Sequence, residues 1–289
     1  RIPALLLRVA ARLSARRAAV VLAVSQAMAD EARGARVDGV VHHGCSLPEH
    51  PRPAVPAPVG GEAEPVQVLM VGNLIENKRV EVVLAGVAEA RARGGAWDLR
   101  IHGTRMDPVY ADRMEALSQL LLGESVLHEP VGREALVATY QRADVLVVGG
   151  AFESFCHPLV EGMRSGCVVV APDVALVREI CGDVAVTYPE GDAAGLARAL
   201  ETAVAERAER TRSGIEWPRR FTWAATVDAT LTAVRSSPSV LVAGHLAPTD
   251  QDRARILIGL SVAPPGGAAT YVAGLAQGLV AADIPHKDQ

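Results

Sequence analysis

Residues 145–171 have the sequence VLVVGGAFESFCHPLVEGMRSGCVVVA, which is typical of a β-strand, a helix and a second β-strand. The apolar runs Val145–Val148 and Val168–Ala171 each have the length of a fully buried strand. Between them, Pro158 can open a helix at its first turn and Gly166 can close it. This order predicts parallel strands in a sheet that helices cover on both faces.

The same alternation of strands and helices extends to both sides of residues 145–171. We expect further strands at Val66–Val71, Leu99–His102, Ser125–His128 and near Ala185–Thr187. We expect helices at Val80–Arg93, Pro108–Leu122, about Glu134–Arg142, about Asp192–Arg207 and within Pro218–Val234. The predicted fold class is therefore α/β, with a Rossmann-like parallel sheet.

Different patterns precede this domain. Residues 1–17 form a basic amphipathic pattern, which we interpret as a helix docked on its own domain or, alternatively, as a face for anionic lipid. A strand at Ala19–Val24, a helix that Ser25 caps and that runs to about Arg33, and a strand at Val37–His42 follow. We interpret the Pro- and Gly-rich residues 51–65 as an interdomain linker, so residues 1–50 belong to a separate domain.

A second linker and a lone βα unit follow the domain of residues 66–235. We place the linker at 236–254, a strand at Arg255–Ser261, a glycine turn at Pro264–Gly267 and a helix at Ala269–Ala281. This unit cannot bury both faces of its strand alone, so we expect residues 255–289 either to dock on the truncated first domain or to begin a further domain that is cut off. The chain as a whole is predicted to be a piece of a longer protein.

Composition excludes several classes of protein. The net charge of −4 and an aromatic content of 3% argue against nucleic-acid binding. The four cysteines lack the C-x-x-C spacing of metal sites, and reduced thiols favour the cytoplasm. The apolar stretch Ala18–Val24 is far shorter than the roughly 20 residues of a membrane span. We therefore expect a cytoplasmic protein, at the inner membrane face if residues 1–17 bind lipid.

Glu153 and Glu161 are the candidate functional acids. In one continuous helix they would lie about 12 Å apart, at about 1.5 Å per residue. With Glu153 on the loop after a strand and Glu161 in the next helix, both can instead face a crevice at the carboxyl edge of the sheet. Lys78, after the strand that ends before Gly72, can reach the same crevice as a charge for phosphate. The alternative is that none of the three binds a ligand: Glu153 is then a surface acid, Glu161 an acid that stabilises a helix start, and Lys78 a solvated lysine.

Backbone groups between the two acids add to this crevice. The backbone N–H groups of the segment Phe155 to Leu159, which contains His157 and Pro158, and the positive end of the helix can meet a diphosphate. His157 can also donate to a phosphate or sugar oxygen. We assign His42 and His43 to a hinge rather than to a metal site, and Cys156 to apolar packing rather than to nucleophilic catalysis.

These motifs resemble the carboxyl-terminal domain of retaining GT-B glycosyltransferases of the group-one family, glycosyltransferase family 4. The resemblance covers Val66–Val234 and rests on Gly72 with Lys78, on Glu153 with Glu161 in an E-x7-E motif, and on Phe221-Thr222-Trp223. It implies a GT-B fold and a nucleoside-diphosphate sugar as co-substrate, with no metal or other cofactor. By the same resemblance, residues 1–50 look like the last part of the family's Rossmann-like, acceptor-side domain, and residues 255–289 look like the opening of another such domain. Two enzymes in tandem, or a circular permutation of one, would both explain this order. It also implies a glycan or lipid-linked acceptor, as in polysaccharide biosynthesis.

The resemblance also implies roles for single residues. Glu153 lies beside the transferred sugar as the catalytic-site acid, Glu161 binds the ribose, and Lys78 binds the diphosphate. The implied donor-binding residues are Gly72, Asn73, Lys78, Phe155, Cys156, His157, Pro158, Leu159 and Glu161. The implied mechanism retains the configuration of the anomeric carbon through a same-face substitution, in which the donor phosphate assists deprotonation of the acceptor.

The sequence departs from the family pattern at a few positions. The family often has Arg where Asn73 stands, Gly where Cys156 stands, and a Pro-Ser pair where Gly149 and Gly150 stand. Loss of the arginine removes one charge from the diphosphate site, and Cys156 adds a side chain where backbone approaches the ligand. A non-catalytic nucleotide-sugar-binding module is therefore the alternative function, and a nucleotide-sugar epimerase is a third.

Overall fold

The computed structural model describes residues 18, 20–32, 35–47 and 64–236. The chain divides into two units: one is Leu47–Arg219, and the other joins the residues up to Ser46 with those from Arg220 onward. The helix predicted for 1–17, most of the linker 51–65, and the linker, strand, turn and helix predicted beyond 236 lie outside the described residues.

The larger unit contains a parallel sheet of six strands in the order β5-β4-β3-β6-β7-β8. The strands are β3 (Val66–Val71), β4 (Trp97–His102), β5 (Leu127–His128), β6 (Val145–Val147), β7 (Val168–Pro172) and β8 (Val186–Tyr188). Strand β3 pairs with β4 on one side and with β6 on the other, so the strand order reverses between β3 and β6. In such sheets the crevice at the carboxyl ends of these two strands is where ligands bind.

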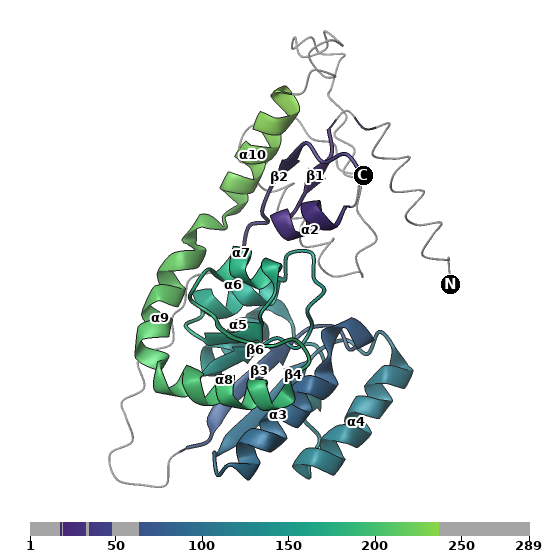
Figure 1. Cartoon of the computed structure of the whole chain (residues 1–289), viewed down its shortest axis with the longest axis vertical. Coiled ribbons are helices and arrows are strands. Elements are labelled where there is room, and N and C mark those ends of the chain that lie inside the picture. Colours follow the sequence, from purple (N-terminus) through teal and green to yellow (C-terminus); the bar gives the residue numbers. More distant parts are fainter. Residues whose placement is uncertain (1–17, 19, 33–34, 48–63, 237–289) are drawn as a thin grey trace. The chain divides into compact units, whose positions relative to one another are not determined.

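Helices cover both faces of this sheet (Figure 1), which confirms the predicted α/β class. Helices α3 (Val80–Ala92), α4 (Pro108–Leu122) and α8 (Ala193–Ala205) lie on one face. Helices α5 (Arg133–Arg142), α6 (His157–Arg164), α7 (Ala175–Cys181) and α9 (Arg207–Glu216) lie on the other. The sequence analysis did not predict α7 and α9, and the helix expected at Asp192–Arg207 ends at Ala205.

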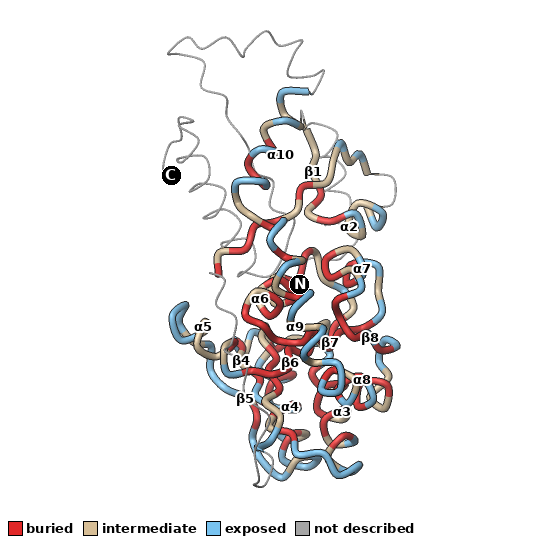
Figure 2. Tube along the Cα trace, turned by 90° about the vertical axis from the view of Figure 1, so that its left-hand side faces the viewer, coloured by how far each residue is buried: buried red, intermediate tan, exposed pale blue. Residues whose placement is uncertain are grey.

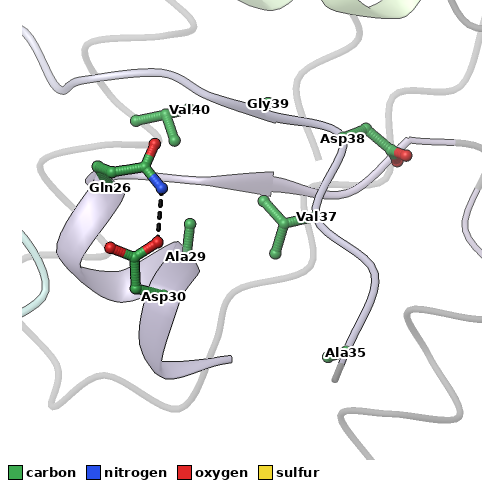
Figure 3. A pocket seen from close by; sticks show the side chains of 8 residues that line it. All are labelled: Gln26, Ala29, Asp30, Ala35, Val37, Asp38, Gly39 and Val40. Atoms are coloured by element: carbon green, nitrogen blue, oxygen red, sulfur yellow. Dashed lines mark hydrogen bonds between the residues drawn. The ribbon is translucent and has the colours of Figure 1, made fainter. Parts of the chain in front are cut away.

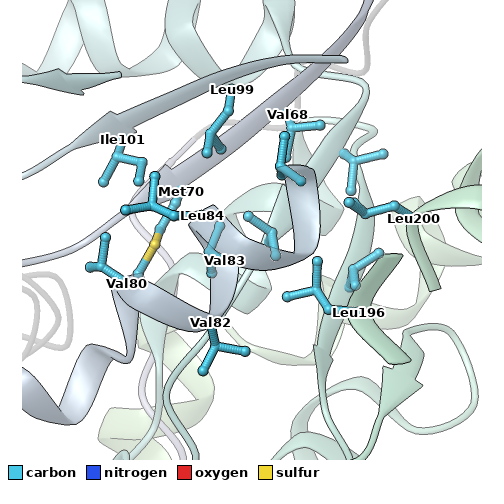
Figure 4. Packing of buried hydrophobic residues seen from close by; sticks show 14 of the residues in the cluster. Val68, Met70, Val80, Val82, Val83, Leu84, Leu99, Ile101, Leu196 and Leu200 are labelled. Atoms are coloured by element: carbon cyan, nitrogen blue, oxygen red, sulfur yellow. The ribbon is translucent and has the colours of Figure 1, made fainter. Parts of the chain in front are cut away.

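The main core lies between strands β3 and β4 and helices α3 and α8 (Figure 4). Val68, Val83 and Leu196 have at most 1% of their surface exposed. A Cβ atom on Gly86 would lie 2.5 Å from Cδ2 of Leu196, so glycine at this position allows α3 and α8 to pack closely. Buried residues run through the strands of this unit (Figure 2), and the sheet therefore forms a rigid base for the loops at its carboxyl edge.

Two elements have the bounds that the sequence predicts. Strand β3 is Val66–Val71, and α4 is Pro108–Leu122. Helix α4 begins where the Asp107 side chain accepts a hydrogen bond from the Tyr110 N–H at 3.1 Å. It ends at Gly123, whose φ of 76° lies in the left-handed region. Local capping signals therefore set the bounds of α4.

The smaller unit contains a parallel pair of strands, β1 (Leu22–Ala23) and β2 (Gly39–Val40), with helix α2 (Gln26–Glu31) between them in the chain. Both strands are shorter than predicted. Ser25 caps α2 as expected, because its hydroxyl accepts a hydrogen bond from the Met28 N–H at 3.1 Å.

Helix α10 (Trp223–Arg235) also packs within the smaller unit. The indole of Trp223 donates to the Ser46 hydroxyl at 2.7 Å, and the Thr226 hydroxyl donates to the carbonyl of His42 at 2.8 Å. The Cys45 N–H donates to the carbonyl of Phe221 at 3.0 Å. The range 66–235 predicted for one domain thus includes a helix whose contacts belong to the other unit.

His42 and His43 contact the aromatic residues that precede and begin α10. His42 meets Phe221 edge-on, and His43 stacks on Trp223 at a centroid distance of 6.2 Å. Residues 18, 20–32, 35–47 and 64–236 contain no group of three or more His, Cys, Asp or Glu side chains that could hold a metal ion. In the same part of the chain, every helix is too short or too polar to cross a bilayer.

Candidate functional site

Two loops meet at the carboxyl edge of the sheet, where the strand order reverses. One follows β3 and contains the 3-10 helix η1 (Glu76–Lys78), and the other, residues 148–156, follows β6. The ammonium group of Lys78 makes an ion pair with Oε1 of Glu153. Only 16% of the Lys78 side chain and 14% of the Glu153 side chain are exposed. The structure therefore brings together two of the candidate residues, from positions 75 apart in the chain.

Close backbone contacts hold the two loops together. A Cβ atom on Gly150 would lie 2.2 Å from the carbonyl oxygen of Asn77, and one on Gly149 would lie 2.7 Å from the carbonyl oxygen of Arg79. Nδ2 of Asn77 donates to the carbonyl of Phe152 at 3.5 Å. Glycines at 149 and 150, where the family often has Pro-Ser, thus let η1 approach the loop that carries Glu153.

Gly72 leaves the space that the Lys78 side chain occupies. A Cβ atom on Gly72 would lie 3.5 Å from Cε of Lys78. Gly72 is held in turn by the loop after β4, because its N–H donates to the carbonyl of His102 at 3.0 Å. A Cβ atom on Gly103 would lie only 1.8 Å from the carbonyl oxygen of Gly72. Gly72 and Asn73 therefore follow β3 directly into the crevice, with Lys78 folded back over Gly72.

The charge of Lys78 depends on Glu153. Burial by itself would lower the pKa of the Lys78 ammonium group, but the negative charge and the hydrogen bond of Glu153 raise this pKa above its usual value. Lys78 is therefore fully protonated at neutral pH. It can act as a cation for phosphate while largely shielded from solvent.

Helix α6 begins at the crevice, but it offers fewer N–H groups than the sequence analysis expected. Pro158 lies in its first turn and has no N–H. The N–H of Leu159 donates to the carbonyl of Cys156 at 3.0 Å, and the Leu159 side chain is fully buried. The expected cradle from Phe155 to Leu159 is thus reduced to at most the N–H groups of Phe155, Cys156 and His157.

Cys156 caps α6 in a backbone conformation that favours glycine. Its φ and ψ are 59° and 70°, in the left-handed region, which costs a residue with a Cβ roughly 1–2 kcal/mol. Its thiol is buried, and burial raises the pKa of this group far above the usual range, with Glu153 raising it further and Lys78 lowering it. The thiol is therefore neutral, which agrees with a packing role and not with a nucleophilic one.

Phe155 and His157 lie where the loop after β6 enters α6. Phe155 is 1% exposed, and its ring meets the imidazole of His157 edge-on at a centroid distance of 5.2 Å. Burial lowers the pKa of His157 to about 4, so its imidazole is neutral at physiological pH. His157 can donate a hydrogen bond to an oxygen of the ligand, but it adds no positive charge.

Glu161 lies on α6 against Tyr140 of α5. The Tyr140 hydroxyl donates to Oε2 of Glu161 at 2.8 Å, and Tyr140 is completely buried. Burial raises the pKa of Glu161, while the Tyr140 hydrogen bond and the charge of Arg133 lower it. The sequence analysis missed Tyr140, although a tyrosine predicted in a helix that packs on the sheet must find a partner for its hydroxyl.

The resemblance implies that Glu161 binds a ribose diol, whose hydroxyls donate to a carboxylate, and we expect the Tyr140 hydroxyl to keep Glu161 ionised for this contact. Tyr140→Phe removes the hydrogen bond that lowers the pKa of Glu161, so this pKa rises. The loss of nucleoside diphosphate affinity on acidification should then begin at a higher pH than in the unchanged chain. Calorimetric titrations from pH 7 down to about 4.5 measure this shift. A parallel loss at every pH would instead indicate a purely structural role for Tyr140.

Two surface hollows lie away from these residues. One lies in the smaller unit between α2 and residues 35–40 (Figure 3), where Nε2 of Gln26 donates to Asp30 at 2.7 Å. The other lies along β8 and α8, beside Arg198 and Arg210. None of the residues that the sequence analysis proposed for the functional site lines either hollow. The candidate site is therefore defined by the contact of Lys78 with Glu153, two residues that the sequence analysis placed at the same crevice.

Known proteins resemble this chain over the same region. A family model described as glycosyl transferases group 1 matches residues 54–216, more than half of the 289 residues. A D-inositol 3-phosphate glycosyltransferase of Corynebacterium diphtheriae is 31% identical over 168 residues, which cover 55% of this chain and 39% of that protein.

Solved structures share the fold at low sequence identity. Sucrose-phosphate synthase from Thermosynechococcus elongatus is 21% identical, with a TM-score of 0.67 over 82% of this chain and 62% of that chain. HepE of Anabaena, solved in complex with UDP and glucose, is 17% identical, with a TM-score of 0.64 over 78% and 66% of the two chains. The chain spans less than two thirds of the D-inositol 3-phosphate glycosyltransferase and of the sucrose-phosphate synthase. Its fold is of the GT-B type, and the chain belongs to the family of group 1 glycosyl transferases.

Proposed function

We propose that the chain binds a nucleoside-diphosphate sugar and transfers the sugar, with retention of configuration, to a glycan or lipid-linked acceptor. The observation that carries the proposal is the meeting of Lys78 and Glu153 at the carboxyl edge between β3 and β6. This is the crevice where sheets of this order bind nucleotides. Membership of the group 1 family supports the same class of reaction.

Departure of the nucleoside diphosphate requires positive charge where the leaving oxygen becomes negative. Lys78 supplies a full charge there, and the amino end of α6 supplies a partial one. The proposal assigns no role to a metal ion. The anionic Glu153 positions the sugar hydroxyls, and Glu161 accepts hydrogen bonds from the ribose.

Glu161→Ala is expected to weaken binding of uridine or guanosine diphosphate by at least about tenfold, since hydrogen bonds to a charged group contribute roughly 1.5–3 kcal/mol each. Isothermal titration calorimetry on the 289-residue chain measures the change. Glu134→Ala, which removes an exposed acid from the first turn of α5, serves as the control and should leave affinity unchanged. Equal affinities of the unchanged chain and Glu161→Ala would remove the ribose role.

A non-catalytic nucleotide-sugar-binding module is the second candidate function. The engaged N–H of Leu159 favours it, because one donor group fewer remains at α6 for a leaving diphosphate, and Asn73, where the family often has Arg, supplies no charge. Hydrolysis of the nucleotide sugar separates the two functions. A chain that binds the donor but neither hydrolyses it nor transfers its sugar is a binding module.

A further inference from the structure

The Lys78–Glu153 contact neutralises the cation on which the proposed diphosphate site depends. Both side chains are largely shielded, and within the described part of the chain the side chain of each is the hydrogen-bond partner of the other. The contact is also built into the backbone, because Gly149 and Gly150 allow η1 to pack on the loop that carries Glu153. In the ligand-free chain, Lys78 and Glu153 therefore act as a unit of zero net charge.

A diphosphate must compete with Glu153 for this lysine. The two phosphates carry at least two negative charges. Glu153 carries one negative charge, and because it contacts Lys78 it would lie close to a phosphate that binds the same ammonium group. Repulsion between like charges is strong where solvent is excluded. Glu153 must therefore turn from Lys78, or share it, when a nucleoside diphosphate binds.

The donor and the product differ in what they offer to Glu153. The intact donor presents sugar hydroxyls, which can donate to the Glu153 carboxylate and offset its separation from Lys78. After transfer the sugar is gone, so Lys78 is again the best partner for the carboxylate. A group that interacts differently with two ligands shifts affinity between them by that difference.

We propose that Glu153 is an internal counter-ion that competes with the nucleoside diphosphate product for Lys78 and so promotes product release. This role rests on the proposed function and deepens it. Glu153 would then favour binding of the nucleotide sugar over binding of the nucleoside diphosphate, in addition to its contact with the sugar. No covalent step is involved, because only an ion pair exchanges partners.

Glu153→Gln tests this role, since the amide keeps the shape of the side chain and removes its charge. Affinity for the nucleoside diphosphate should rise at least fivefold, and affinity for the nucleotide sugar should rise less or fall. Calorimetry on the full 289-residue chain measures both. Glu76→Gln removes the same charge from an exposed side chain of η1, two residues before Lys78, and should change neither affinity. Unchanged or weaker product binding by Glu153→Gln would overturn the proposal.

A double variant identifies the partner of Glu153. If Glu153 acts through Lys78, the gain from Glu153→Gln should be clearly smaller when Lys78 is already alanine, because only the direct repulsion between Glu153 and the diphosphate is then relieved. A gain of the same size in both backgrounds contradicts the exchange of partners.

Failure of the proposed function gives a different result from failure of the counter-ion role. A chain that binds no nucleoside diphosphate loses both proposals, whereas one that binds it and responds to Glu161→Ala but not to Glu153→Gln loses the counter-ion alone.

Discussion

Lys78→Ala is expected to weaken binding of a nucleoside diphosphate by at least about 30-fold, which corresponds to roughly 2 kcal/mol. Two effects act in the same direction. The diphosphate loses a charge-assisted hydrogen bond, which contributes roughly 1.5–3 kcal/mol. Glu153, itself only 14% exposed, also loses its cation and then repels the ligand from close range. Isothermal titration calorimetry with the diphosphate measures the sum.

The nucleoside without phosphates provides the matching measurement. Its affinity should fall by less than about threefold in Lys78→Ala, because the base and ribose do not need the cation. Lys78→Arg should recover part of the diphosphate affinity, since it restores the charge in a larger and differently shaped group. Equal losses for the nucleoside and the diphosphate would contradict a direct contact between Lys78 and phosphate.

The convergence of Lys78 and Glu153 could be predicted because it follows from topology. Both residues come after strands whose apolar runs identify them, and the carboxyl ends of parallel strands meet at one edge of the sheet. The hydrogen bond from Tyr140 to Glu161 could not be predicted in this way. It depends on how α5 and α6 pack against each other, which no local pattern in either helix specifies.

Of the two helices that the sequence analysis missed, α9 lacks the apolar spacing on which it relies, and α7 has this spacing only over a short length. Helix α9 buries only Gly214, so it has no apolar stripe with helical spacing. Arg210 holds it instead, through hydrogen bonds to the carbonyls of Asp183, Val184 and Ala185. Helix α7 spans seven residues, and its first cap, Val174, offers no side-chain hydrogen bond. Tertiary contacts therefore define α9, whereas the apolar pattern of α7 is too short to be distinguished from a loop.

Gly150→Ala is expected to lower stability and to disturb the site at the same time. The new Cβ would lie 2.2 Å from the carbonyl oxygen of Asn77 and 3.2 Å from Cα of Lys78. Both are backbone atoms, which cannot move aside as the end of a side chain can, so η1 or residues 148–156 must shift. Forced overpacking of this kind typically costs about 1–3 kcal/mol. The midpoint of thermal unfolding should therefore fall by several degrees.

Gly214→Ala is the matched control for this glycine, because it makes the same chemical change in the same unit. Its Cβ would meet only Cγ1 of Val184, at 3.4 Å, and alanine is favoured over glycine inside a helix by about 1 kcal/mol. Stability should therefore stay the same or rise. If Gly150→Ala and Gly214→Ala behaved alike, the close approach of η1 to residues 148–156 would be wrong.

The effect of Gly150→Ala on binding links the fold to the proposed chemistry. A shift of η1 by about 1 Å moves the Lys78 ammonium away from both Glu153 and an incoming diphosphate, and misplacement of this size can cost about 100-fold in rate. Diphosphate affinity should therefore fall at least about tenfold at temperatures where the variant is still folded. Affinity for the nucleoside alone should change little, since Glu161 and Tyr140 lie on α6 and α5 rather than on η1. Loss of stability without loss of diphosphate affinity would show that Lys78 reaches its ligand independently of this backbone contact.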